Sequence, residues 1–270
     1  MPSFLSYKHG SEALKPQWLA HTAIMPSAPS PHLSVIIPAY NEEARLPSTL
    51  KQVIEYLQEQ KYGSEILVID DGSTDGTGGI AQGWDASGIP LRMLFHPDHA
   101  NLGKGASVKL GMLKARGAYR LFMDADNSTT IDHVSRFWPY FEQGYEVVIG
   151  SRALKDSVIG RHQAKIKEVA GRFGNLLIRA LLIPEIRDTQ AGFKMFTARA
   201  AELIFPRLAI DRWGFDIELL AIARLHRLRV CEVPITWINA RGSKVTLSSY
   251  FQVLDEIRRI RNNLKRGRYR

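Results

Sequence analysis

The regular alternation of short apolar runs with helical stretches constrains this chain more than any other feature. Each run has the length and β-branched content of a buried strand. The runs cover residues 33–39, 65–70, 91–95, 119–123 and 146–150, and helical spacing lies at 46–60, 104–116 and 131–142. Strands that alternate with helices need crossover connections, so they lie parallel in one sheet with both faces covered. The sequence therefore predicts an α/β fold with a mostly parallel central sheet flanked by helices.

The pattern changes at both ends of the chain. Residues 1–32 lack sustained periodicity and end in several prolines, which predicts a flexible N-terminal tail. Past residue 160 the alternation loosens into a long helix, a strand near 193–196, a helix near 215–225 and a strand near 229–234. We therefore assign residues 33–245 to one domain and residues 246–270 to a basic amphipathic C-terminal helix.

Polar clusters follow one predicted strand after another. In open parallel sheets, ligands bind beyond the carboxyl ends of the strands. The clusters are Tyr40-Asn41-Glu42, Asp70-Asp71-Gly72-Ser73, Asp124-Ala125-Asp126 and Ser151-Arg152. All of them are expected at one edge of the sheet, which makes that edge the predicted ligand site.

Asp124 and Asp126 are the sharpest candidates for metal ligands. In an extended segment, side chains at positions i and i+2 point the same way, so the two carboxylates converge. Adjacent carboxylates repel each other unless a cation lies between them. Mg²⁺ prefers such oxygen ligands and shares its sites with substrate phosphates. The alternative is a solvated turn with a helix-capping aspartate.

Two further segments combine glycines with charged side chains. Asp70 and Asp71 can accept hydrogen bonds from ribose hydroxyls or a base edge, or they can belong to an ordinary turn in which Asp75 caps the next helix. Lys104 opens a helix between two glycines and suits an anion, although it can also be a surface cation. The glycine fingerprints of dinucleotide-binding proteins and P-loop kinases are missing.

The ordered set of motifs resembles the family 2 glycosyltransferases of GT-A fold, a Rossmann-like nucleotide-sugar-binding fold. The resemblance covers residues 33 to 240 and is strongest to the branch that uses dolichyl or polyprenyl phosphate, especially its β-glucosyltransferases. It rests on Pro38-Ala39-Tyr40-Asn41-Glu42-Glu43, Asp70-Asp71-Gly72-Ser73-Thr74-Asp75, Asn101-x-Gly103-Lys104-Gly105, Asp124-Ala125-Asp126, Gly150-Ser151-Arg152, Asp188-Thr189-Gln190-Ala191-Gly192-Phe193-Lys194 and Arg212-Trp213-Gly214-Phe215-Asp216-Ile217-Glu218-Leu219-Leu220.

The resemblance implies a role for each matching residue. Catalytic residues are expected at Asp126, Arg152 and Asp188, and metal ligands at Asp124 and Asp126. The acceptor phosphate is expected to meet Arg152 and a second cation, for which Arg161, Lys165 and Arg172 compete. The implied nucleotide-sugar contacts are Pro38, Ala39, Tyr40, Glu42, Asp70, Asp71, Lys104, Asp124, Ala125 and Gln190.

The implied reaction is an inverting, metal-dependent transfer of a hexose, glucose from UDP-glucose, to a polyprenyl or dolichyl phosphate. Mg²⁺ or Mn²⁺ is the implied cofactor. A hydroxyl acceptor would need a general base, for which Asp188 is the candidate. An acceptor phosphate is already anionic and needs cations, so Asp188 would then orient other groups. The alternatives are a GDP-mannose-dependent polyprenyl-phosphate mannosyltransferase, a family 2 enzyme with a soluble acceptor and a non-catalytic sugar-nucleotide sensor.

The net charge of +9 indicates an anionic partner. Nucleic acid is not expected, because no nucleic-acid-binding motif occurs. The C-terminal helix carries one apolar stripe opposite a basic face, which fits either packing on the body or peripheral binding to an anionic membrane. No apolar run reaches the ~18 residues of a membrane-spanning helix, and no secretory signal is apparent. With Cys231 as the single cysteine, these features predict a cytoplasmic protein at the cytoplasmic face of a membrane.

Overall fold

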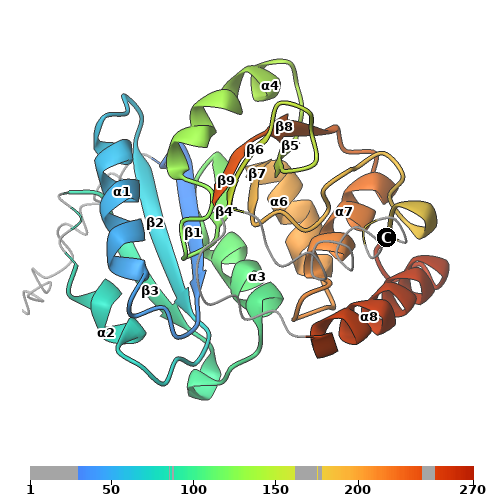
Figure 1. Ribbon diagram of the computed structural model, residues 1–270, viewed down its shortest axis with the longest axis horizontal. Helices are drawn as coiled ribbons and strands as arrows, with labels where there is room; N and C mark the ends of the chain where they lie inside the picture. The colour runs from blue at the N-terminus through green and yellow to red at the C-terminus, as the bar shows by residue number, and fades with distance from the viewer. Residues whose placement is uncertain (1–29, 85, 87, 162–174, 176–177, 239–246) are drawn as a thin grey trace, which may run out of the picture.

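A seven-stranded sheet forms the centre of the molecule. The computed structural model describes residues 30–84, 86, 88–161, 175, 178–238 and 247–270. Within them the strand order is β3-β2-β1-β4-β7-β5-β8 (Figure 1). These strands are β1 (Leu33–Ala39), β2 (Ser64–Asp70), β3 (Leu91–Phe95), β4 (Tyr119–Met123), β5 (Val147–Ser151), β7 (Phe193–Thr197) and β8 (Val230–Pro234). All neighbours are parallel except β7, which runs antiparallel to β4 and β5, so the predicted mostly parallel sheet is confirmed.

Helices cover both faces of the sheet, and the alternation of side chains within each strand supplies both cores. On β1, Val35 and Ile37 belong to one core and Ile36 to the other, and all three are fully buried. The first core contains α1 (Leu46–Gln58), the 3₁₀ helix η2 (Ile131–Arg136) and α4 (Trp138–Glu142). The second contains α3 (Lys104–Lys114), α6 (Ala198–Ile204), the 3₁₀ helix η3 (Phe205–Arg207) and α7 (Phe215–Leu225). The short helices α2 (Thr77–Gln82) and η1 (Pro97–His99) flank β3 in the chain.

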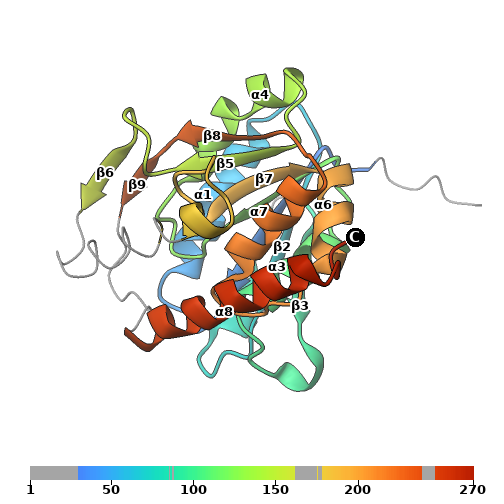
Figure 2. The same cartoon turned by 90° about the vertical axis from the view of Figure 1, so that its right-hand side faces the viewer.

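The prediction of a single helix over residues 131–142 is wrong, because the structure has two shorter helices there. The segment divides at Phe137 into η2 and α4, and Pro139 lies in the first turn of α4, where a missing N–H is tolerated. Sequence reasoning also missed a small second sheet, in which β6 (Val158–Arg161) pairs in parallel with β9 (Thr236–Ile238). Figure 2 shows this ribbon standing away from the main sheet. Three or four residues are too few to give a readable alternation. Helix α6 was missed as well.

The strand order places the expected ligand edge at a topological switch point. β1 lies between β2 and β4, and the chain turns outward on both sides of it. The usual binding position in such sheets therefore lies beyond the carboxyl ends of β1 and β4. Because β7 is antiparallel, its first residue lies at this same edge. The segment that precedes β7, residues 188–192, is thereby brought beside the ends of β4 and β5.

The C-terminal helix α8 (Leu247–Lys265) packs along α7 (Figures 1 and 2). Ile257 and Ile260 are buried in the same core as α7, which supports the packed alternative for its apolar stripe. The exposed side carries Arg258, Arg259, Arg261, Lys265 and Arg266. None of the described helices has the length and apolar character needed to cross a membrane.

The predicted domain limits, after residues 32 and 245, stay predictions. Most of the tail expected at 1–32 lies outside the described residues. Its last two residues are part of the folded domain, because Pro31 O accepts a hydrogen bond from Ala118 N and His32 O accepts one from Tyr119 N. The long helix expected past residue 160 also lies mostly outside the described residues, and residues 178–181 are helical.

Candidate active site

The loops that follow β1 and β2 are tied together at the ligand edge. Asn41, whose φ is 51°, receives a hydrogen bond on its side-chain oxygen from Thr74 N at 2.8 Å, and its own N–H donates to Ser73 Oγ at 2.9 Å. The backbone N–H of Glu42 donates to Thr77 Oγ1 at 2.8 Å. Asn is one of the few side chains that adopts this left-handed conformation readily. The two loops therefore form one rim, which carries the residues expected to bind the nucleotide.

Asp70 and Asp71 lie in that rim, but their carboxylates are buried and locally bonded. Asp70 Oδ1 accepts from Ser73 N at 2.9 Å. Asp71 accepts from the backbone N–H groups of Leu102 and Gly103 at 2.9 to 3.0 Å. Asp71 therefore shapes the start of α3, a role that sequence reasoning did not foresee. Contact of either residue with base or ribose stays a prediction.

Lys104, at the start of α3, forms an ion pair with Asp124, which follows β4. Lys104 Nζ lies 2.5 Å from Asp124 Oδ1, with 23% of the lysine side chain and 35% of the aspartate side chain exposed. Burial alone would lower the pKa of Lys104, but the carboxylates of Asp124 and Asp216 outweigh it and raise that pKa. A structural role as a mere surface cation does not fit this geometry. Lys104 is a permanent positive charge at the edge of the sheet.

Asp126 completes the acidic pair beyond β4. One of its oxygens accepts from Ser128 N at 3.0 Å. Burial, and then the neighbouring carboxylate of Asp124, raise the pKa of Asp126. No cluster of three or more His, Cys, Asp or Glu side chains suited to a metal occurs among the described residues. Two carboxylates fit a divalent cation that takes its other ligands from water and substrate phosphates, and bound metal would relieve the repulsion that raises this pKa.

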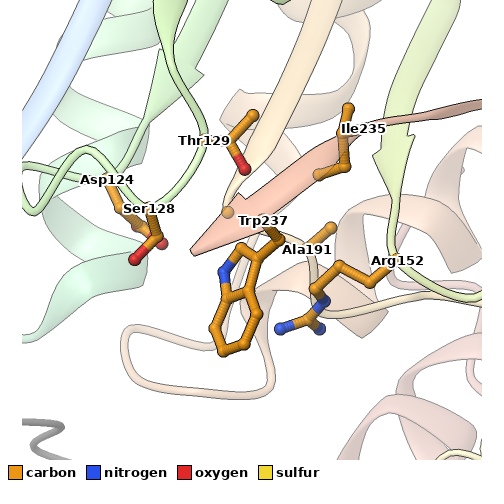
Figure 3. A pocket seen from close by; sticks show the side chains of 8 residues that line it. Asp124, Ser128, Thr129, Arg152, Ala191, Ile235 and Trp237 are labelled. Carbon is orange, nitrogen blue, oxygen red and sulfur yellow. The ribbon is translucent and has the colours of Figure 1, made fainter. Parts of the chain in front are cut away.

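A pocket opens beside Asp124 and extends to Arg152 (Figure 3). Arg152 follows β5, and its guanidinium binds Asp188 through two hydrogen bonds, Nε to Oδ2 at 2.8 Å and Nη2 to Oδ1 at 2.9 Å. The backbone N–H of Arg152 donates to Oδ2 as well, at 2.9 Å. The pocket is lined by Asp124, Ser128, Thr129, Arg152, Ala191, Gly192, Ile235 and Trp237.

The Arg152–Asp188 pair fixes the chemistry of both groups. Burial would raise the pKa of Asp188, but the Arg152 guanidinium outweighs burial and lowers it. Burial would likewise lower the pKa of Arg152, and Asp188 raises it. Glu232 holds Asp188 from behind, because its carboxylate accepts from the N–H groups of Arg187 and Asp188 at 2.8 and 2.9 Å. Asp188 is thus an anion with both oxygens engaged, which makes it a poor general base.

The segment before β7 forms the floor of the pocket, and glycine is required there. A Cβ atom on Gly192 would lie 2.0 Å from Asp124 Oδ2. Beneath this floor, the fully buried Lys194 ammonium donates to Ala191 O at 2.5 Å and forms an ion pair with buried Asp216. Sequence reasoning quoted these residues within motifs but gave them no role. The sequence signal that could have indicated such a role is a charged residue, Lys194, inside the apolar run of β7.

The remaining predicted site residues lie outside the pocket lining. Ala125 is buried, with its carbonyl accepting from Thr49 Oγ1 at 2.7 Å, and Pro38 and Ala39 end β1. Tyr40 is 37% exposed and Glu42 pairs with Arg45 at 2.6 Å. Gln190 is exposed beside Ala191. Arg161 ends β6, its side chain lies outside the described part, and Lys165 and Arg172 lie outside the described residues altogether.

Comparison with solved structures supports the fold. Over 86% of this chain and 80% of the other, it superposes with a TM-score of 0.60 on glucosyl-3-phosphoglycerate synthase from Mycobacterium tuberculosis, which is 22% identical. That structure was determined in complex with Mn²⁺, UDP and glucosyl-3-phosphoglycerate. Its likeness confirms the GT-A fold expected from the motifs.

Comparison of sequences supports the family. The dolichyl-phosphate β-glucosyltransferase of Dictyostelium discoideum is 37% identical over 85% of this chain and 74% of its own length. The human dolichyl-phosphate β-glucosyltransferase is 32% identical over 99% of this chain and 84% of its own length. The family model described as glycosyl transferase family 2 matches residues 34–205. The acidic pair and the cations of the site agree with this match. The chain is a glycosyltransferase and belongs to glycosyl transferase family 2.

Proposed function

We propose that this chain transfers glucose from UDP-glucose to dolichyl phosphate or another polyprenyl phosphate, with inversion and with the help of a divalent cation. The names of the similar glucosyltransferases support the lipid acceptor and the β-linked product. The Mn²⁺ in the structurally similar synthase supports a divalent cation as cofactor, and its UDP supports uracil as the base of the nucleotide sugar. A GDP-mannose donor is the alternative that the same fold allows.

The arrangement of Arg152 and Asp188 carries the proposal. A hydroxyl acceptor has to lose a proton, so its enzyme needs a general base with a free oxygen. Asp188, the candidate general base, is ion-paired through both oxygens with Arg152, whose side chain lines the pocket. The carboxylate in the lining itself, Asp124, is paired with Lys104. A phosphate acceptor is already anionic near pH 7 and has no proton to lose. The pocket therefore suits a phosphate monoester as nucleophile.

The residues divide between the leaving group and the acceptor. As an acceptor phosphate oxygen forms its bond to the anomeric carbon, the bond from that carbon to the diphosphate breaks and negative charge moves onto the nucleotide. Lys104 stabilises this charge from the start of α3. Asp124 and Asp126 would hold Mg²⁺ or Mn²⁺, which supplies further positive charge to the diphosphate when it is bound. Arg152 orients the acceptor phosphate, and Asp188 orients Arg152.

Peripheral binding to the cytoplasmic face of a membrane is a further part of the proposal. The apolar stripe of α8 is packed on the body, so the exposed basic side is what this helix offers to a bilayer. Each basic residue near an anionic surface contributes about 1 kcal/mol. Binding to anionic vesicles should therefore weaken steeply as salt is added. Binding that is insensitive to salt would contradict this part.

A phase-partition assay tests the proposal. Purified protein is incubated with sugar-labelled UDP-glucose, MnCl₂ and a polyprenyl phosphate, and the label that enters the organic phase is measured. We expect lipid-soluble label that disappears with EDTA and falls about 10²-fold or more in Asp126→Asn. Asp255→Asn, an exposed position on α8, is the matched control and should retain activity. Label that stays in the aqueous phase as a glucoside of a soluble phosphate would favour a soluble acceptor.

A further inference from the structure

Trp237 lies against the guanidinium of Arg152 and has no role in the reaction as described so far. It occupies the middle of β9, and its indole lines the pocket beside Arg152 (Figure 3). Arg152 Cζ lies 5.3 Å from the centroid of the indole ring. This distance is within the range of a cation–π contact, and tryptophan is the strongest aromatic partner for one.

The backbone on both sides of Trp237 is anchored to the segment that follows Asp126. Thr236 N donates to His133 Nε2 at 2.9 Å, and Ile238 N donates to Ser128 O at 2.8 Å. On its other side, β9 pairs with β6. The backbone that carries the indole is therefore tied to the segment that follows the acidic pair.

The contacts of Arg152 leave a defined part of its guanidinium for a ligand. Asp188 takes one N–H from Nε and one from Nη2. Trp237 lies against one face. A guanidinium has five N–H donors in one plane, and paired N–H groups match two oxygens of a phosphate. Of the three donors that Asp188 does not take, one N–H of Nη1 and the second N–H of Nη2 lie along one edge of this plane.

We propose that Trp237 is a positioning residue that, together with Asp188, holds the Arg152 guanidinium so that its remaining edge receives the phosphate monoester of the acceptor. This inference rests on the proposed function, because it takes Arg152 as the acceptor-phosphate residue. A guanidinium that is already held on one edge and one face loses little conformational freedom when it binds a phosphate. The affinity of Arg152 for phosphate therefore depends on the aromatic face of Trp237. The affinity for the nucleotide sugar, which binds on the side of Asp124 and Lys104, does not depend on that face.

Two apolar substitutions, one without and one with an aromatic ring, test the role. Trp237→Leu should raise the KM for acceptor about tenfold, the size of a partly desolvated cation–π contact. Trp237→Phe should keep most of the acceptor affinity, since it restores an aromatic face. The KM for UDP-glucose should be unchanged in both. A purely structural role would raise both KM values together or lower the melting temperature, and that outcome would overturn the proposal.

The source of the phosphate is separated by two acceptors, a short-chain prenyl phosphate and soluble glycerol 3-phosphate. The proposed role predicts that Trp237→Leu binds each of the two phosphates more weakly than the wild type does, and by the same factor. A loss confined to the prenyl phosphate would mean that the indole contacts the hydrocarbon chain, and the positioning role would be wrong.

Direct binding keeps this inference separate from the proposed function. Protein loaded with UDP and Mn²⁺ is titrated with each phosphate in a calorimeter, so that turnover is not needed. About tenfold weaker binding by Trp237→Leu supports the positioning role even if glucose is not the transferred sugar. Equal binding by wild type and Trp237→Leu overturns it, even where wild-type protein forms glucosyl lipid and the proposed function stands.

Discussion

The two halves of the sheet use charged residues in opposite ways. In the parallel half, β3-β2-β1-β4, the pair of Lys104 and Asp124 lies at the strand ends with 23% and 35% of the side chains exposed. In the half that contains β7, the pair of Lys194 and Asp216 is enclosed, with 0% and 6% exposed. The first pair can meet a ligand. The second lies beneath the pocket floor and can act only through it.

The direction of β7 explains this difference. An antiparallel strand starts at the ligand edge, so the residues that precede it can enter the site, while the strand itself runs back into the core. Lys194 is the second residue of β7 and is therefore carried below the floor. Its ammonium holds Ala191 O, which supports the segment that carries Gly192. Charges at the ligand edge should thus control turnover, and the enclosed pair below the pocket floor should control stability.

The largest expected effect comes from breaking the enclosed pair. Lys194→Met leaves Asp216 buried without its partner and should lower the free energy of unfolding by about 3–5 kcal/mol. The double variant Lys194→Met/Asp216→Leu should lose less, because no charge is left uncompensated. Lys104→Met, in the partly exposed pair, should lose no more than about 1 kcal/mol. Urea titration measures the free energy of unfolding of all three variants. Equal losses in the two single variants would contradict the difference between the enclosed and the partly exposed pair.

The next effect tests the seam between the halves, where Gly192 meets Asp124. Gly192→Ala places a Cβ atom 2.0 Å from Asp124 Oδ2, so the carboxylate has to move. A displacement of about 1 Å at such a site lowers turnover by about 10²-fold. The matched control is Gly63→Ala, where the new Cβ meets nothing within 4 Å and activity should persist. Normal kcat in Gly192→Ala would show that the position of Asp124 is not critical for transfer.

The same division separates what could be predicted from the sequence from what could not. Residues 33–39, 91–95 and 119–123 are strands with the expected bounds, because buried parallel strands read as unbroken apolar runs. The polar clusters after β1, β2, β4 and β5 lie at one edge as expected, because parallel strands end together. Asp124 and Arg152 were therefore named from sequence. Lys104 was named from its position at the start of a helix, and Asp188 from the family resemblance.

The other contacts join residues that are distant in the chain. The ring of Trp237 meets Arg152 only because β9 pairs with β6, and neither strand is long enough to give a period. The sequence also did not indicate that the Asp71 carboxylate accepts hydrogen bonds from the N–H groups of residues about thirty positions later. Such partners follow from tertiary packing, which local pattern does not encode.

A smaller effect tests whether the segment that follows α8 stabilises the β7 half. Tyr269 is fully buried, and its hydroxyl donates to Glu218 Oε1 on α7 at 2.5 Å. Tyr269→Phe leaves that oxygen without this donor and should cost about 1–3 kcal/mol. Arg268→Ala, an exposed neighbour, should cost little. Thermal unfolding measures both, and activity at a temperature well below unfolding should be unchanged. Lost activity in folded Tyr269→Phe would mean that this C-terminal segment contributes to turnover directly.

The smallest effect is a pH dependence at His133, which joins the two halves. Thr236 N donates to its Nε2 at 2.9 Å and its Nδ1 lies 3.1 Å from Thr130 O, so the neutral ring with its proton on Nδ1 satisfies both partners. Burial lowers the pKa of His133 below its ordinary value of 6.5. The unfolded chain therefore binds a proton before the folded chain does, and stability falls as pH drops below 6.5 until the folded pKa is reached. His133→Gln offers an oxygen to Thr236 without titrating, so denaturant unfolding of this variant should decline less over that window. Exposed His99→Gln should decline as wild type does, and a wild-type slope in His133→Gln would remove His133 as the cause.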